Sequence, residues 1–470
     1  MESWGRGKIR WVDYYASFET VVSDSEAPGD LATVVIDAIP KSAATALKTL
    51  ERERVVEDLD HHFPVFLLTA TLESERAKAL VDSPGWVELS IGTDRFGEED
   101  SFEASAISFE GDEDGARTSF WVKVRSTSVA KRNLSALERL AALPTVADAT
   151  ASSLLPFNCA DGVRGVAVYD VGQANLCALV DAAEHPVVFF DLGWPLSFNG
   201  KSRRLPGPFN PFIPARRGSG PQPVILSHLD WDHWGFAFHS GRALFDPQRG
   251  HWRSVVKYKD EALRRPWLMR RPRFHRHKLG PSHIHFVLTL SRTTLFDGSP
   301  ALTFWPAKRA RLDFTHYTVV RCSPSQRRES SAAYLRNNES LALLAKLEHR
   351  PEKVLLTGDA DYPSIPANYL RGLTGIVAPH HGGAITEFST PVAPRGSRMI
   401  RSTYPGCYRS VPSDDAETEA ELSGWEIYST NVRVKCPSMC CVHGNKLIPL
   451  DVLNPKCGCR QVSRAGLCLS

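Results

Sequence analysis

Apolar and polar residues follow two different rhythms in the first third of the chain. Residues 32–39 (ATVVIDAI), 63–72 (FPVFLLTATL) and 117–127 (RTSFWVKVRST) are short apolar runs of the kind found in strands. Between them, residues 42–59 and 73–83 place apolar side chains at helical spacing. This alternation of strands and helices predicts a small α+β sandwich.

An acidic stretch at residues 98–116 interrupts the alternation. Its sequence, EEDSFEASAISFEGDEDGA, is typical of a solvated loop or sheet edge. The next predicted helix opens with Ser135 and Glu138 in the spacing of a capping box. We therefore place a first domain at residues 1–150.

A second texture begins near residue 160, where apolar, β-rich runs each end in polar residues. Residues 165–180 and 186–194 are two such runs, and residues 223–227 (PVILS) form a short predicted strand. Residues 353–362 and 375–383 repeat the plan. Catalytic groups commonly follow strand ends, so this pattern predicts a catalytic domain over residues 160–432.

The composition is that of an ordinary globular protein. The chain has 470 residues, of which 42% are hydrophobic and 23% charged, so global disorder is excluded and two or three domains are expected. No stretch approaches the ~18 apolar residues of a membrane span, and the first residues do not resemble a secretory leader. We expect a cytoplasmic protein without a membrane partner.

Charge is distributed unevenly along the chain. Residues 1–150 carry 16 Lys and Arg against 27 Asp and Glu, whereas the remainder carries 40 against 26. A basic second part would attract a polyanion such as nucleic acid. The alternative is that the two parts complement each other within the protein, and both interpretations stay open.

The stretch LSHLDWDHWG at residues 226–235 concentrates imidazole and carboxylate groups. His228, Asp230 and Asp232 alternate, so in an extended strand end their side chains point the same way. His233 follows directly. Imidazole and carboxylate together suit Zn²⁺, Mn²⁺ or Fe. A single pair of this kind is more often a surface ion pair, so the prediction depends on further motifs.

Six motifs in a fixed order provide that context. They are DVGQAN (170–175), FFDLG (189–193), SHLDWDH (227–233), NNES (337–340), LLTGDAD (355–361) and APHHGG (378–383). This order resembles the metallo-β-lactamase fold and, more narrowly, the metallo-β-lactamase domain of the competence DNA-uptake channel proteins, the ComEC type. The resemblance covers roughly residues 160–432 and implies an αββα sandwich.

The resemblance also implies a metal-dependent hydrolase that cleaves DNA. Its metal ligands are expected at His228, Asp230, Asp232, His233, Asp359 and His380 or His381. Six ligands suffice for two divalent ions, zinc or manganese, about 3.5–4 Å apart. Asp359 would bridge the ions, and Asp232 or Asp359 would accept the proton of the attacking water.

Two departures from the family pattern affect this expectation. The usual extra His before the bridging Asp is not evident. Among the histidines of the interval, we interpret five as surface or phosphate-contacting: His275, His277, His283, His285 and His316. A carboxylate-rich first metal position favours Mn²⁺ over Zn²⁺. The late Tyr-Gly-His-Pro-Ser segment appears as CYRSVPSD, which aligns Tyr408 and Ser413 as substrate contacts but places Val411 where His is expected.

Supporting roles are predicted for residues beside the ligands. We expect Asp191 to orient the ligand loops through hydrogen bonds, and DVGQAN to form a tight turn beside the metals. Asn338 would lie near the substrate phosphate or belong to a turn before a strand. Both interpretations of Asn338 stay open.

A basic segment at residues 264–278 carries arginines interleaved with aromatic residues. Arginine forks and ring faces suit phosphodiester backbones and splayed bases. We predict substrate contacts from Arg270, Arg271 and Arg273, with a solvated charged surface as the alternative.

Cysteines are concentrated in residues 433–470. A structural zinc ion there would be held by four of six residues: Cys436, Cys440, Cys441, His443, Cys457 and Cys459. Unliganded thiols are the equal alternative. The scattered Cys159, Cys177, Cys322 and Cys407 are expected to be reduced and buried.

The first domain has a weaker resemblance of its own. LVDSPGWVEL and LAALPTVADAT share a rhythm similar to the ferredoxin-like propeptide and inhibitor domains of subtilisin-like proteases. This resemblance implies a protease or other protein partner that regulates the hydrolase. The main hypothesis is a metal-dependent nuclease; the alternatives are a small-molecule phosphodiesterase and a protease-regulated effector.

Overall fold

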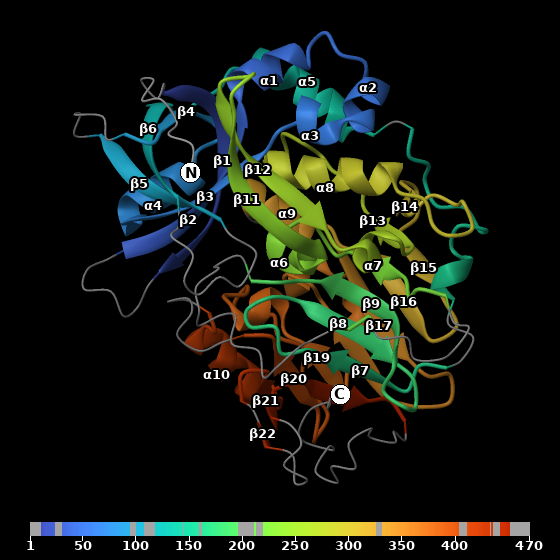
Figure 1. Cartoon of the computed structure of the whole chain (residues 1–470). Coiled ribbons are helices and arrows are strands. Elements are labelled where there is room, and N and C mark those ends of the chain that lie inside the picture. Colours follow the sequence, from blue (N-terminus) through green and yellow to red (C-terminus); the bar gives the residue numbers. More distant parts are fainter. Residues whose placement is uncertain are drawn as a thin grey trace. The chain divides into compact units, whose positions relative to one another are not determined.

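The chain forms two compact units, each built from three segments. The computed structural model describes residues 11–23, 31–94, 100–107, 118–143, 145–158, 162–195, 211–212, 220–325, 331–403, 411–432, 434–435 and 442–451. The first, which we call the barrel unit, comprises Met1–Leu143, Phe238–Tyr258 and Pro272–Arg292. The second, the two-sheet unit, comprises Pro144–Ala237, Lys259–Arg271 and Thr293–Ser470. Figure 1 colours the strands of the barrel in blue to cyan.

Six antiparallel strands close into a barrel in the order β1-β2-β3-β5-β6-β4. They are β1 (Val12–Ser23), β2 (Leu31–Pro40), β3 (Phe66–Glu73), β4 (Val87–Gly92), β5 (Ser101–Ala106) and β6 (Ser119–Ser126). Side chains alternate between the two faces of a strand, so every second residue fills the barrel. In β1 these are Tyr14, Ala16 and Phe18. The apolar alternation in the sequence is thus explained by a closed interior.

The barrel differs from the open ferredoxin-like sheet that we expected. Closure requires β1 and β4, in which Val12 lies opposite Ile91. The sequence pattern did not reveal β1, and β5 lies inside the acidic stretch predicted as a loop. Phe102 and Ala104 nevertheless point into the barrel core. Two additional strands therefore close a sheet that the predicted elements would have left open.

Helices and a hairpin complete the barrel unit. They are α1 (Lys41–Ala46), α2 (Arg52–Glu57), α3 (Leu59–His62), α4 (Ser74–Val81), α5 (Lys131–Ala141), β11 (Phe238–Asp246), β12 (His251–Tyr258) and α8 (Pro281–Arg292). Every residue of α8 from Pro281 to Leu290 is buried. The Tyr14 hydroxyl donates to the carbonyl of Trp252, which joins the hairpin to the barrel. The continuous hydrolase domain expected at residues 160–432 is therefore interrupted twice by parts of the barrel unit.

The two-sheet unit contains two seven-stranded mixed sheets. Their orders are β14-β13-β10-β9-β8-β7-β24 and β15-β16-β17-β18-β19-β20-β21. The first sheet has β7 (Gly165–Val168), β8 (Leu176–Val180), β9 (Pro186–Leu192), β10 (Val224–Ile225), β13 (Trp267–Met269), β14 (Leu302–Phe304) and β24 (Lys446–Pro449). The second has β15 (Arg311–Asp313), β16 (Tyr317–Arg321), β17 (Leu341–Lys346), β18 (Lys353–Leu356), β19 (Gly375–Val377), β20 (Arg398–Arg401) and β21 (Glu426–Ser429).

Short elements connect and cover these strands. The helices are α6 (Trp231–Trp234), α7 (Asp260–Leu263), α9 (Ala332–Asn338) and α10 (Asp414–Leu422). The 3₁₀ turns are η1 (Leu155–Phe157), η2 (Gly235–Ala237), η3 (Tyr362–Ser364), η4 (Ala367–Tyr369) and η5 (Pro379–Gly382). A separate strand pair joins β22 (Val434–Lys435) to β23 (Val442–His443).

One apolar core lies between the two sheets. Phe190 and Ile225 enter it from the first sheet, and Leu343 and Leu356 enter it from the second. On the outer face of the second sheet, Ala420 of α10 belongs to a separate core cluster. The coarse prediction of a mixed α and β chain with packed sheets is confirmed.

The segment expected as a Cys-rich tail contributes to this architecture. Strand β24 pairs with β7, so part of residues 433–470 belongs to the first sheet. Cys436, Cys440, Cys441, Cys457 and Cys459 lie outside the described residues, as do Cys159 and Cys407; His443 is placed in β23, but its side chain is not described. Cys177 and Cys322 are buried free thiols, as predicted.

Candidate metal centre

Three strand ends of the two-sheet unit carry the predicted ligands. His228 and Asp230 follow β10, and Asp232 and His233 lie in the single turn of α6. Asp359 follows β18; the two histidines of the HHGG motif follow β19 in η5. Strands β18 and β19 are parallel neighbours, so their carboxyl ends lie at one edge of the second sheet.

Asp232, His233 and His381 offer ligand atoms that all lie within 4.8 Å of one another, and Asp359 lies beside two of them. His233 Nε2 lies 3.1 Å from Asp359 Oδ1 and 3.7 Å from Asp232 Oδ1. His381 Nε2 lies 3.0 Å from Asp232 Oδ2 and 4.0 Å from Asp359 Oδ1. Ligands about 2.0–2.2 Å from a tetrahedral ion are separated from one another by roughly 3.3–3.6 Å. Asp232, His233 and His381 therefore form one candidate site for a divalent ion.

A second group of three adjoins the first and shares one of its members. His228, His233 and Asp359 offer ligand atoms within 4.8 Å of one another. His228 Nε2 lies 4.0 Å from Asp359 Oδ2, and His380 Nδ1 lies 3.2 Å from the same oxygen. His380 is partly exposed, whereas His381 is buried. Of the two histidines that the sequence left as alternatives, His381 belongs to the first group of three, with Asp232 and His233.

Opposite charges act strongly on one another in this buried cluster. Burial acts to lower the pKa of His233, but the carboxylates of Asp359 and Asp191 raise it well above its usual value. Burial acts to raise the pKa of Asp359, but His233 and His380 lower it well below its usual value. Metal ligands bind in their deprotonated forms, so loading an ion would favour the neutral form of the His233 imidazole.

Asp191 holds the ligand loop from β9. Its Oδ1 accepts the backbone N–H of Ser227 at 2.7 Å, and its Oδ2 accepts the Ser227 hydroxyl at 2.8 Å. The same Oδ2 lies 2.8 Å from His233 Nδ1, and all three residues are completely buried. This contact fixes the ring so that Nε2 faces the ligand cluster. These contacts are the kind expected for the orienting role predicted for Asp191.

Residues at the centre adopt backbone conformations that side chains normally avoid. Asp191, His380 and His381 have φ values of 65°, 54° and 58°, three of seven such non-glycine residues in the described part of the chain. Gly358 in the TGD motif has φ of 57°, and a Cβ there would meet the Ser227 side chain at 2.7 Å. Left-handed non-glycine residues cluster at functional sites because the surrounding structure must hold them in place.

The DVGQAN turn also holds the ligand loop in place through hydrogen bonds. Asn175 N–H donates to the carbonyl of Asp232 at 2.9 Å, and its own carbonyl accepts Gly193 N–H at 2.7 Å. The Asn175 amide also donates to Asp359 Oδ1 at 3.4 Å. This motif therefore serves as the structural turn beside the ligands that the sequence predicted.

A substitution at Gly193 should destabilise the protein because the backbone of the ligand loop leaves no space for a side chain. A Cβ at Gly193 would lie 1.8 Å from the Asp232 carbonyl. We expect Gly193→Ala to lower the free energy of unfolding by about 2–3 kcal/mol. Gly220→Ala is the control, since nothing lies within 4 Å of its added Cβ. Urea denaturation measures both variants; equal stability would contradict this close approach.

Arg336 of α9 was not among the predicted residues. It is nearly buried, and its Nε forms an ion pair with Asp230 Oδ1. Asp230 Oδ2 lies 3.3 Å from His228 Nε2. The amide of Asn337, oriented to satisfy its neighbours, donates to Asp230 Oδ2 at 3.3 Å and accepts from His380 Nδ1 at 3.2 Å. The only sequence signal for this ion pair was Asp230 itself, a carboxylate at a position where the family pattern also allows His.

The structure places two other predicted residues behind the ligand loops. Asn338 accepts the N–H of Asp361 at 3.0 Å and donates to the Tyr334 carbonyl at 2.9 Å, which corresponds to the turn interpretation. Ser413 caps α10, and its N–H donates to the Gly382 carbonyl at 2.8 Å. Tyr408 lies outside the described residues.

The three arginines predicted to contact substrate are divided between the two units. Arg270 donates to the carbonyls of Cys322 and Glu339. Arg271 pairs with Asp148 at 3.0 Å. Both belong to the two-sheet unit, whereas the exposed Arg273 belongs to the barrel unit. A joint role in substrate binding stays a prediction.

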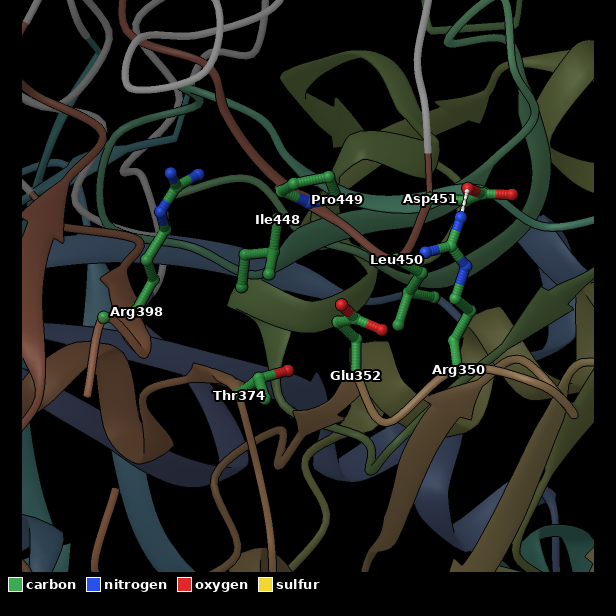
Figure 2. Close-up of a pocket in the computed structure, with 9 residues that line it drawn as sticks. Arg350, Glu352, Thr374, Arg398, Ile448, Pro449, Leu450 and Asp451 are labelled. Carbon is green, nitrogen blue, oxygen red and sulfur yellow. Dashed lines mark hydrogen bonds and ion pairs between the residues drawn. The ribbon is translucent and has the colours of Figure 1, made fainter. Parts of the chain in front are cut away.

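A cavity of about 330 Å³ lies at another edge of the two-sheet unit (Figure 2). Figure 2 shows Glu352 and Thr374 at its wall and Arg350 paired with Asp451 at 2.7 Å. Glu352, Thr374 and Arg398 mark the amino ends of β18, β19 and β20. The metal ligands follow the carboxyl ends of β18 and β19, so this cavity is separate from the candidate centre.

Comparisons with known proteins found no match for this chain: no protein-family model matches it, and no curated protein matches it. Among the helices within the described ranges, none has the length and apolar character needed to cross a membrane.

Proposed function

We propose that the two-sheet unit is a metal-dependent hydrolase of phosphodiester bonds, with the αββα metallo-β-lactamase fold of the ComEC type. One observation carries the proposal. Two strand ends bring together the ligand atoms of Asp232, His233 and His381 within 4.8 Å of one another. A third strand end places Asp359 Oδ1 3.1 Å from His233 Nε2. Buried imidazole and carboxylate groups in this arrangement suit zinc or manganese.

The chemistry of the centre would follow from a bound ion together with residues of the chain. A divalent ion lowers the pKa of its bound water and neutralises charge on phosphoryl oxygens. Asp191 and Ser227 hold the His233 ring in one orientation, and Asn175 fixes the Asp359 carboxylate. Asp232, the less buried of the two carboxylates, is the preferred acceptor for the proton of the attacking water.

The proposed reaction is simple hydrolysis. The oxygen of water forms a bond to phosphorus while one P–O ester bond breaks. One proton of the water is taken up by a carboxylate and finally resides on the leaving oxygen. No oxidant or further reactant is required.

Nucleic acid is the proposed substrate class. The support is the family resemblance and the excess of basic residues after residue 150, where 40 Lys and Arg face 26 Asp and Glu. A small phosphodiester is the alternative, and the contacts of Arg270 and Arg271 with the protein itself favour it. The substrate test must therefore separate the two.

Metal dependence is the decisive property of the proposed function. We expect protein stripped with EDTA to lose phosphodiester cleavage and to regain it with Mn²⁺ or Zn²⁺. A supercoiled plasmid and a chromogenic small phosphodiester are compared side by side. Faster plasmid nicking supports a nuclease, and cleavage of the small ester alone supports the alternative substrate. Cleavage that persists after chelation, or no cleavage with either metal, would contradict the proposal.

Removing residues 1–150 would not isolate the predicted regulatory role of the first domain. A chain that begins near residue 155 still contains β11, β12 and α8, which belong to the barrel unit. Helix α8 is buried along almost its entire length, so this truncation would expose apolar surface. The protease or other protein partner of residues 1–150 stays a prediction, which binding studies with the full chain can address.

A further inference from the structure

The two candidate ligand groups compete for one imidazole nitrogen. His233 is a member of both groups of three. Its Nδ1 lies 2.8 Å from Asp191 Oδ2, so Nε2 alone faces the ligands. Nε2 lies close to both Asp232 and Asp359. Because one nitrogen binds one ion, only one group can be complete at a time.

Beside His228 of the second group, Asp230 is already part of a network of side chains. Asp230 Oδ1 forms an ion pair with Arg336, and Oδ2 lies 3.3 Å from His228 Nε2. In its satisfied orientation the Asn337 amide donates to Oδ2 as well. Both oxygens that could bind an ion therefore have partners in the protein. An arginine stays protonated, so its charge opposes a second cation at Asp230.

We propose that the centre holds one divalent ion rather than two. Asp232, His233 and His381 bind this ion with Asp359 beside them, and Arg336 supplies a second positive charge at Asp230. This inference rests on the proposed function, since it assumes that the centre binds a divalent ion. A fixed guanidinium next to an ion would stabilise phosphoryl charge without a second metal.

The number of bound ions tests this inference without measuring activity. Chelator-stripped protein is dialysed against micromolar Mn²⁺, and bound manganese is measured by elemental analysis. We expect one equivalent per chain and the paramagnetic resonance spectrum of an isolated Mn²⁺ ion. Two equivalents with a spin-coupled spectrum would overturn the one-ion inference while leaving the proposed function intact. No bound metal with either Mn²⁺ or Zn²⁺ would overturn both.

Variants locate the ion and test the role of Arg336. We expect His381→Ala to bind well below one equivalent and Asp230→Asn to retain one. Arg336→Gln removes the charge and should raise the content toward two equivalents at high Mn²⁺, whereas Arg336→Lys keeps the charge and should stay at one. Metal loss in Asp230→Asn with full binding in His381→Ala would overturn the assigned position. Equal content in folded Arg336→Gln and Arg336→Lys, checked by circular dichroism, would overturn the role of Arg336.

Discussion

Asp232→Ala should abolish metal-dependent hydrolysis while leaving the fold intact. Its carboxylate stands between His233 and His381, at 3.7 Å and 3.0 Å from their Nε2 atoms. Removing a partner that only orients a ligand already costs about 10–100-fold, so removing a ligand should cost more than about 100-fold. Stability should change little, because the side chain is partly exposed and the backbone carbonyl still accepts the Asn175 N–H.

The measurement combines initial rates at saturating Mn²⁺ with a thermal unfolding curve. Asp313→Ala is the matched control, since it removes an exposed carboxylate that pairs with exposed Arg311 and accepts the Thr318 hydroxyl, and none of these residues is a predicted ligand. Such surface pairs contribute little, so this control should hydrolyse substrate like the parent protein. A folded Asp232→Ala variant with the parent rate would refute the metal centre.

Asp191→Asn should weaken metal binding about 10–100-fold, because it removes the carboxylate that orients the His233 ring. Asparagine has nearly the same size as aspartate and tolerates the left-handed backbone, where Asp191 has φ of 65°. The substitution therefore isolates the carboxylate charge. Without it, the amide nitrogen would face His233 Nδ1 or the Ser227 hydroxyl, and the imidazole would lose the partner that fixes its tautomer.

Competition with a chromogenic chelator measures the affinity change directly. Asp181→Asn provides the control, because Asp181 is also buried, accepts two backbone N–H groups and lies 3.4 Å from His185. Asp181 lies in the β8–β9 hairpin and touches no predicted ligand. We expect the Asp181→Asn variant to have a lower free energy of unfolding but the same metal affinity as the parent protein. Equal metal affinity in Asp191→Asn and the parent would show that Asp191 only supports the fold.

The ligands could be predicted from sequence because each one is encoded locally. The spacing of His228, Asp230 and Asp232 fixes their direction at a strand end, and Asp359 and His381 follow apolar runs of strand length. Short-range patterns of this kind need no knowledge of which strands pair. That is why the order of motifs was sufficient to nominate the residues that the structure brings together.

Other features depend on contacts between distant segments and were missed. Arg336 meets Asp230 only because α9 lies beside the loop after β10, which no local pattern reveals. Strand β5 has one acidic residue, Glu103, but it lies within an acidic stretch that hides its strand pattern. Its pairing with β3 and β6 decides its conformation. The same long-range pairing closes the barrel, so composition alone favoured an open sheet.

The three-segment construction of the barrel unit constrains how the protein can be made in the cell. Its last segment, Pro272–Arg292, leaves the ribosome well after Leu143 has been added. At translation rates of about 5–20 residues per second, the first segment waits on the order of ten seconds for α8. We expect chaperones to protect the nascent barrel strands during this interval. We also expect the two units to reach their native states together rather than in sequence.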